Sequence, residues 1–184
     1  MKLKKLCKTI IITLLASLFA TLCFFSGILS YRVNSVSGYI ENYSKLYGVE
    51  KSLIISVIYT ESKFNKNAKS SKGAIGLMQV KPTTATFILN SETPITESFL
   101  FDSENNIKVG VLYLKYLTEK YGDLITVIAC YNAGEGNVIK WLKNGKITVK
   151  SIPFKETNKY VRLVLRRKKF IDNYMWICEY LQLS

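Results

Sequence analysis

The sequence predicts an all-α domain that follows one apolar N-terminal segment. After Ser30, apolar side chains recur at intervals of three and four almost throughout, which is the helical period. One segment, 147–149, has an extended pattern, but it is too short to found a sheet. The chain has 184 residues with 48% hydrophobic side chains, which is enough for one packed core. We therefore expect residues 31–184 to form one compact helical domain.

The segment before this domain has the pattern of a membrane anchor. Residues 9–29 contain no charged side chain, and a helix of about 20 apolar residues spans a bilayer. A secretory signal has a shorter apolar core of about 7–15 residues, so the length favours an uncleaved anchor over a cleaved signal. Basic flanks stay in the cytoplasm. We expect residues 1–30 to be a single-pass transmembrane anchor in the cell membrane, with residues 31–184 on the outer, cell-wall side. Four lysines form the flank: Lys2, Lys4, Lys5 and Lys8.

The expected helices of the domain follow from periodicity and end signals. Gly48 stops the first helix, Asp123 is a suitable N-cap for the fifth, and Thr157 for the last. The expected helices run over 36–47, 50–62, onward from Pro82, 107–121, 124–131, 138–142 and 157–181.

Composition excludes several kinds of chemistry. The chain contains no histidine, so Ser-His-Asp and Cys-His mechanisms and nearly all catalytic zinc sites are excluded. We expect no metal and no cofactor, with carboxylates, Lys, Tyr and Cys left for acid-base steps. The four cysteines lack metal-type spacing; a Cys130–Cys178 disulfide is possible, but two small buried side chains fit better.

Glu61 stands out as a candidate general acid. At about 100° per helical residue, Glu61 falls inside the apolar arc of helix 50–62. A carboxylate on the core side of a helix end is partly desolvated, which raises its pKa as a general acid requires. The arc is formed by Leu53, Ile54, Val57 and Ile58, and the opposite side by Ser52, Ser56 and Thr60.

The loop after Glu61 is suited to form a pocket wall. Gly73 and Gly76 permit positive φ, so the loop can fold back over the helix end. Leu77, Met78 and Gln79 then supply an apolar wall and one amide that can donate and accept hydrogen bonds.

These residues resemble the catalytic domain of soluble-type lytic transglycosylases, which is related to goose-type lysozyme. Four blocks carry the resemblance over about residues 39–167, with small departures at Lys66, Ser103 and Cys130. The blocks are Glu61-Ser62-x-Phe64 through Gly76-Leu77-Met78-Gln79 to Thr84-Ala85; Asp102 with Asn106-Ile107, Gly110 and Tyr113-Leu114; Tyr131-Asn132-Ala133-Gly134; and Ile152-Pro153-Phe154-Lys155-Glu156-Thr157 with Tyr160-Val161.

The resemblance implies a lysozyme-like α fold and a peptidoglycan-cleaving enzyme. It implies cleavage of the β-1,4 bond between N-acetylmuramic acid and N-acetylglucosamine, with Glu61 as acid and then base and a 1,6-anhydro ring as product. Glycosidases normally need two carboxylates, whereas this reaction needs one. It also implies substrate-binding roles, which we expect for Ser70, Gln79, Met78, Tyr131, Asn132 and Tyr160.

Other interpretations of these residues stay open. Tyr131 and Tyr160 also suit ordinary core packing, and Asn132 suits a turn. Asp102 and Glu156 are expected to be structural, as caps or through backbone amides. A hydrolytic muramidase of the same fold and a non-catalytic peptidoglycan-binding scaffold are the alternative functions.

The expected partners are peptidoglycan strands and, through the N-terminal helix, the cytoplasmic membrane. The net charge of +13 suits anionic partners in general, but no nucleic-acid motif is present and none is expected to bind. A basic run near the end of the chain could grip nucleic acid, phosphate-rich polymers or lipid headgroups, although a solvated helix face is the favoured interpretation. The run is Arg162, Arg166, Arg167, Lys168 and Lys169.

Overall fold

The computed structural model describes residues 13–19, 21, 31–143 and 145–180, with side chains to 176. It divides into two units, residues 1–35 and 36–184. In the first unit, residues 13–19 are helical and exposed, and residues 31–34 form a helical turn. None of the described helices has the length and apolarity needed to cross a bilayer. Most of the predicted anchor, residues 9–29, lies outside the described residues.

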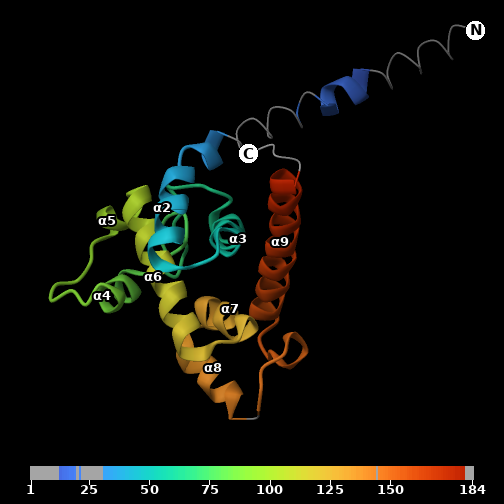
Figure 1. Ribbon diagram of the computed structural model, residues 1–184. Helices are drawn as coiled ribbons and strands as arrows, with labels where there is room; N and C mark the ends of the chain where they lie inside the picture. The colour runs from blue at the N-terminus through green and yellow to red at the C-terminus, as the bar shows by residue number, and fades with distance from the viewer. Residues whose placement is uncertain (1–12, 20, 22–30, 144, 181–184) are drawn as a thin grey trace, which may run out of the picture. The chain divides into compact units, whose positions relative to one another are not determined.

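The second unit is helical, as the sequence predicts (Figure 1). Its described residues contain no β-strand, only isolated bridges that pair Ile75 with Lys69 and with Val80. One short helix, α5, was not expected. The elements are α2 (Ser37–Tyr47), α3 (Lys51–Ser62), α4 (Pro82–Ile88), α5 (Glu97–Phe101), α6 (Ser103–Tyr121), α7 (Leu124–Ala133), α8 (Glu135–Leu142), η1 (Val149–Ser151) and α9 (Lys155–Tyr180).

The helix ends confirm some of the expected caps and correct others. Asp123 caps α7 by accepting from the Thr126 N–H at 3.0 Å. Thr157 is not the N-cap of the last helix, because α9 begins two residues earlier and Thr157 is buried. The extended pattern at 147–149 holds only in part: Thr148 is extended, with φ of −119° and ψ of 161°, but Val149 enters the 3₁₀ helix η1.

Helix α3 is buried on both sides. Its apolar arc is fully covered, and α9 packs against it on the other side (Figure 1). Ser56, opposite the arc, is therefore as buried as the arc itself. The Ser56 hydroxyl donates to the Ser52 carbonyl oxygen at 2.6 Å, so its burial leaves no polar group unsatisfied.

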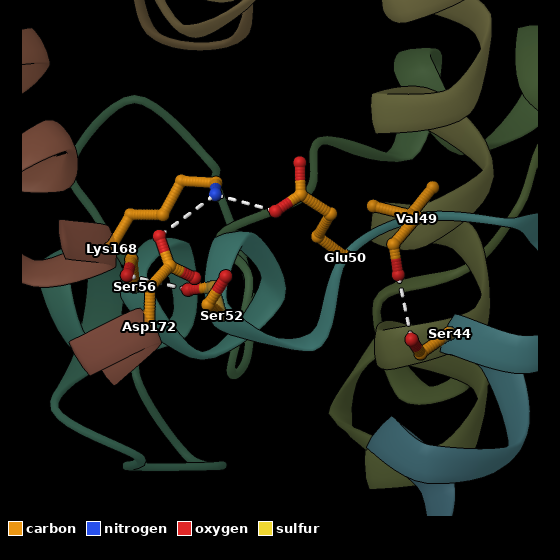
Figure 2. Close-up of polar contacts among 7 residues, drawn as sticks. All are labelled: Ser44, Val49, Glu50, Ser52, Ser56, Lys168 and Asp172. Atoms are coloured by element: carbon orange, nitrogen blue, oxygen red, sulfur yellow. Dashed lines mark hydrogen bonds and ion pairs between the residues drawn. The ribbon is translucent and has the colours of Figure 1, made fainter. Parts of the chain in front are cut away.

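A charged contact fastens α9 to the start of α3. Figure 2 shows Lys168 between Glu50, at the beginning of α3, and Asp172, one turn further along α9. The Lys168 Nζ lies 2.5 Å from Glu50 Oε2 and 3.0 Å from Asp172 Oδ2. The Lys168 side chain is only 12% exposed, but Glu50 and Asp172 are 67% and 43% exposed, so solvent reaches the carboxylate side of both ion pairs.

Two close contacts fix the loop between α3 and α4 on α6. The Asn106 amide donates to the carbonyl oxygens of Ile75 and Leu100, and its oxygen accepts from the Met78 N–H at 2.8 Å. The fully buried Met78 side chain lies directly over Gly110 of α6. The small residue at 110 is thus what lets the loop approach the helix so closely.

We predict that Gly110→Ala destabilises the domain by about 1–3 kcal/mol, since overpacking of a core costs that much. An added Cβ would lie 2.4 Å from Met78 Sδ and 2.9 Å from Met78 Cβ. Chemical denaturation measures the free energy of unfolding. The matched control is Gly136→Ala in α8, where an added Cβ meets nothing within 4 Å, and its stability should be unchanged or slightly raised. Equal stability of both variants would contradict the close packing.

Candidate active site

Glu61 lies in the last turn of α3, where the chain reverses sharply. The helix ends at Lys63, which adopts the left-handed conformation with φ of 51°, and Phe64 follows with φ of 60°. Two consecutive non-glycine residues at positive φ are uncommon, and the buried Phe64 ring helps to hold them. The reversal turns the following loop back toward Glu61.

The loop folds back over the helix end as the sequence predicts. Gly73 and Gly76 have φ of 75° and 77°. At Gly76 a side chain would also collide with Asn106, since an added Cβ would lie 2.3 Å from its Nδ2. The Ser62 hydroxyl, beside Glu61, donates to the Leu77 carbonyl oxygen at 2.8 Å and ties the loop to α3.

A cleft of about 330 Å³ opens between this loop, α4, α6, α7 and the start of α9. Glu61 and Glu156 are its carboxylates, and Lys72 and Lys81 its cations. The remaining lining residues are small, polar or aromatic: Ser70, Ala74, Gln79, Val80, Thr84, Tyr113, Tyr131, Asn132, Ala133 and Gly134.

The environment of Glu61 raises its pKa to about 7, from an ordinary value of 4.5. Desolvation by burial is the largest cause, and the negative charge of Glu156 adds to it. The Tyr160 hydroxyl opposes both by donating to Glu61 Oε1 at 2.7 Å. No other donor of the described residues reaches the carboxyl, so its second oxygen is available to a ligand. The carboxyl can therefore hold or release a proton near neutral pH.

Two tyrosines, the buried Tyr160 and the partly buried Tyr131, lie near this carboxyl. Tyr160 of α9 comes from 99 residues along the chain, and burial together with Glu61 raises its pKa well above 10. Tyr131 of α7 donates to the Met78 carbonyl oxygen at 2.9 Å, and its pKa is likewise raised by burial. Both phenols stay neutral, so they act as hydrogen-bond donors that position Glu61 and the loop.

Gln79 and Ser70 present polar groups with part of their capacity already used. The Gln79 amide nitrogen donates to the carbonyl oxygens of Ala68 and Gly76, at 3.2 and 3.0 Å. Both of its N–H donors are thus occupied, and its side-chain oxygen is the group that can meet a ligand. Ser70 Oγ accepts from the Ala74 N–H at 3.0 Å and keeps its own O–H to donate.

The structure brings most of the predicted site residues together. Four of them line the cleft with Glu61: Ser70, Gln79, Tyr131 and Asn132. Tyr160 does not line the cleft, but its hydroxyl contacts the Glu61 carboxyl. Met78, predicted to bind substrate, does not line the cleft. Its side chain is 0% exposed because it packs on Gly110, and only its backbone takes part, through Tyr131 and Asn106.

Some lining residues were not singled out from the sequence. Tyr113 and Thr84 stand in the motif blocks, so their motif positions were an available signal, whereas Lys72 and Lys81 carry no pattern of their own. Asp102 is structural as expected, since it caps α6 by accepting from the Asn105 N–H. Glu156 differs from its expected role: it lies in the first turn of α9, lines the cleft and faces Lys72 at 3.8 Å.

Among the described residues, neither a metal-binding cluster nor a cysteine lines this cleft. No group of three or more His, Cys, Asp or Glu side chains within the described part of the chain could hold a metal ion. Cys130 is buried with a free thiol, and burial raises its pKa to about 12. The side chain of Cys178, the other cysteine of the possible disulfide, lies outside the described residues.

The raised pKa of Glu61 predicts a pH-dependent stability cost. Because the folded-state pKa of about 7 exceeds 4.5, the stabilising contribution of Glu61 is complete below pH 4.5 and is lost as pH rises through 7. Glu61→Gln should therefore raise the free energy of unfolding at pH 8, by up to about 3 kcal/mol, and change it little at pH 4. Denaturation at both pH values measures this. The control Glu92→Gln, at an exposed position, should show no such difference, and a destabilised Glu61→Gln at pH 8 would contradict the burial of the charge.

Solved structures share this fold. The chain superimposes on the 70 kDa soluble lytic transglycosylase of Escherichia coli with a TM-score of 0.70 and 35% identity, over 76% of this chain and 24% of that one. It matches an inactive glutamate-to-glutamine mutant of the lytic transglycosylase Slt from Pseudomonas aeruginosa with a TM-score of 0.69 and 29% identity, over the same shares. The helical unit thus agrees with the expected lysozyme-like α fold.

Sequence relatives agree with the structural ones. The chain is 39% identical over 137 residues to the membrane-bound lytic murein transglycosylase C of Shigella sonnei, and 36% identical over 143 residues to the soluble lytic murein transglycosylase of Salmonella typhimurium. These matches cover 67% and 72% of this chain but only 38% and 22% of the two relatives. Residues 38–152 match the transglycosylase SLT domain. The match covers more than half of the chain and includes Glu61 and most of its cleft, so the chain belongs to the transglycosylase SLT domain family.

Proposed function

We propose that this protein is a peptidoglycan lytic transglycosylase that cleaves the β-1,4 bond between N-acetylmuramic acid and N-acetylglucosamine without consuming water. The observation that carries the proposal is the partly buried carboxyl of Glu61 at the wall of a cleft, where burial raises its pKa to about 7. Membership of the family and the names of its relatives support the same activity.

In the first step, protonated Glu61 acts as a general acid. It donates its proton to the glycosidic oxygen, and the bond from that oxygen to the anomeric carbon of the muramic residue breaks. A pKa close to the working pH suits this step, because a large fraction of the carboxyl is protonated and still acidic enough to transfer its proton. Tyr160 holds one carboxyl oxygen, which leaves the other to face the substrate.

In the second step, the same carboxylate acts as a base. It removes the proton from the C6 hydroxyl of the muramic residue, and that oxygen forms a bond with the anomeric carbon. The 1,6-anhydro ring closes, the proton returns to Glu61, and the atoms balance without water. One carboxylate is sufficient for both steps, unlike the pair that hydrolytic glycosidases use.

The remaining cleft residues are suited to bind sugar. The free oxygen of Gln79 can accept from the N–H of an N-acetyl group, and Ser70 Oγ can donate to a sugar or acetamide oxygen. Tyr131 offers a neutral phenol oxygen and ring, and Asn132 lies beside it on the cleft wall. We assign these four residues, with Glu61, to substrate binding, and Tyr160 to positioning of Glu61.

The N-terminal segment supports a membrane-bound form of this enzyme. Residues 9–29 carry no charge and follow four lysines, which suits a single span with the N-terminus in the cytoplasm. A relative with a similar catalytic region is named as membrane-bound. In this arrangement the domain would act on the inner layers of the wall.

A second candidate function is hydrolysis by the same fold. Glu156 also lines the cleft, so a second carboxylate is present that could activate water. Its side chain is 78% exposed and faces Lys72, which suits a solvated surface group better than a buried base. We therefore favour the single-carboxylate reaction over a muramidase.

Mass spectrometry of fragments released from purified peptidoglycan by the full chain tests the function. We expect 1,6-anhydromuramic ends, lighter by one water than hydrolytic ends, and none with Glu61→Gln. Glu92→Gln serves as the matched control and should release the same products as the unchanged protein. Reducing ends would establish the muramidase instead, and no release by either the unchanged protein or Glu61→Gln would point to a non-catalytic scaffold.

Tyr160→Phe tests the positioning of Glu61 through the pH profile of kcat/KM. Loss of the donated hydrogen bond makes the carboxylate less stable, so the pKa of Glu61 should rise above about 7. Glu61 then stays protonated to higher pH, and the alkaline fall of activity should move upward. Tyr39→Phe, a matched change on α2, should leave the profile in place. An unmoved alkaline limb in Tyr160→Phe would contradict the positioning role and reduce Tyr160 to packing.

A further inference from the structure

Four cations form a stripe along the outer face of α9. Lys159, Arg162, Arg166 and Lys169 are all exposed. Their spacing of three, four and three residues places them within an arc of about 80° on one side of the helix. The stripe extends over about 15 Å of helix axis. We call these four residues the basic stripe.

The basic stripe is not used by the fold. Within the described residues none of its members pairs with a carboxylate, and Arg162 makes one hydrogen bond, from Nε to the Asn158 side-chain oxygen. The two neighbouring cations behave differently. Lys168 is held between Glu50 and Asp172 (Figure 2), and Arg167 lies over the Tyr59 ring and donates to the Thr60 hydroxyl. The interpretation of the whole run as a solvated face is thus wrong for these two.

Two large aromatic side chains continue the same face. Phe170 is 73% exposed and Trp176 is 63% exposed. By helical geometry both lie within about 60° of the line that the basic stripe follows. The buried side of α9, with Val164 and Tyr160, lies about 140° or more away from that line. The outer face is therefore separate from the side that meets Glu61.

We propose that this outer face of α9 docks on an anionic phospholipid surface. Helices that lie at a bilayer interface combine basic side chains, which meet anionic headgroups, with Trp and Phe, which enter the headgroup boundary. A soluble polyanion would satisfy the basic stripe but offers no apolar surface to cover Phe170 and Trp176. The aromatic pair therefore favours a lipid surface over a dissolved polymer.

The proposal rests in part on the membrane anchor included in the proposed function. Six residues, 30–35, separate the proposed span from Val36, and six residues reach at most about 20 Å. A domain tethered so closely must turn one of its faces toward the headgroups. Docking through the outer face of α9 leaves the side of α9 that holds Glu61 unblocked, so it is compatible with catalysis.

Quenching of Trp176 fluorescence by brominated lipids tests this contact directly. The chain has two tryptophans, so a Trp141→Phe background leaves Trp176 as the single reporter. The full chain is placed in vesicles of brominated phosphatidylglycerol or brominated phosphatidylcholine. We expect quenching and a blue shift of Trp176 in the anionic vesicles, with loss of both in the neutral ones.

Matched triple variants separate the basic stripe from net charge. Arg162→Gln, Arg166→Gln and Lys169→Gln together should abolish the difference between the two lipids. The control triple variant removes the same charge from exposed positions elsewhere, and its Trp176 quenching should still differ between the two lipids. Its changes are Lys143→Gln, Lys146→Gln and Lys150→Gln. Equal loss in both triple variants, or equal quenching of the unchanged chain in both lipids, would overturn the proposal. So would a change of Trp176 emission with soluble polyphosphate but not with anionic vesicles.

Two further readouts keep this proposal distinct from the proposed function. Association of the full chain with neutral vesicles tests the membrane anchor. If the chain does not associate with neutral vesicles, flotation with anionic vesicles compares the two triple variants. Equal flotation of the two variants would overturn the docking face. Release of anhydromuramic products from soluble glycan fragments tests the enzyme. The stripe variant should release them as the unchanged chain does, because the basic stripe does not touch the cleft.

Discussion

The hydrogen bond between Tyr160 and Glu61 joins helix α9 to the end of α3 at the carboxyl that carries the proposed acid-base chemistry. Glu61 stands at the end of α3. Tyr160 comes from α9, which packs along the side of α3 that faces away from the apolar arc and reaches Glu61 at the helix end. Without α9, the carboxyl would be solvated and its pKa would return toward 4.5. Burial raises the pKa and the phenol lowers it, and the balance lies close to neutrality. The packing of α3 against α9, fastened at the other end by Lys168, is therefore also a condition for the acid-base function.

The cleft wall depends on a second set of contacts, in which side chains of α6 and α7 bind the backbone of the loop. The loop after α3 has no regular strand among its described residues, so its polar groups need partners from elsewhere. Asn106 from α6 and Tyr131 from α7 bind the N–H and the carbonyl oxygen of the same residue, Met78. Gln79 follows directly and adopts a positive φ of 50°, which places its side chain at the cleft. Hydrogen bonds to the residues on both sides, Met78 and Val80, stabilise this conformation of Gln79.

The sequence was informative for features that depend on the residues of one helix alone. Helical periodicity predicted the long helices, and the position of Glu61 within the apolar arc correctly placed it toward the interior. The five-residue helix α5 is too short for periodicity to detect. Ser52 and Ser56 are a different case, because both are polar and yet buried under α9. The Ser56 hydroxyl donates to the Ser52 carbonyl oxygen, and the Ser52 hydroxyl bonds to the Asp172 carboxylate of α9, so neither is left unsatisfied.

Contacts between distant segments were the part that the sequence could not supply. A motif position identified Met78, but it could not distinguish a side chain on the cleft from one packed on Gly110 with a functional backbone. The partner of Glu61 is 99 residues away, and no spacing rule predicts that distance. Glu156 was expected to be structural, through a cap or backbone amides just before a helix that starts at 157, and its place on the cleft follows from α9 beginning at Lys155 instead.

The fold raises the pKa of the Glu61 carboxyl to about 7, so a large fraction of it carries a proton near neutral pH, and the proposed chemistry depends on that proton. Carbon-13 NMR of protein labelled at the glutamate side-chain carboxyl measures this directly, with Glu61→Gln to assign the resonance. We predict that one carboxyl titrates near pH 7 and that its signal is absent from the variant. A Glu61 resonance that titrates near pH 4.5 would contradict this mechanism, because a carboxylate already ionised at neutral pH could not begin the reaction as an acid.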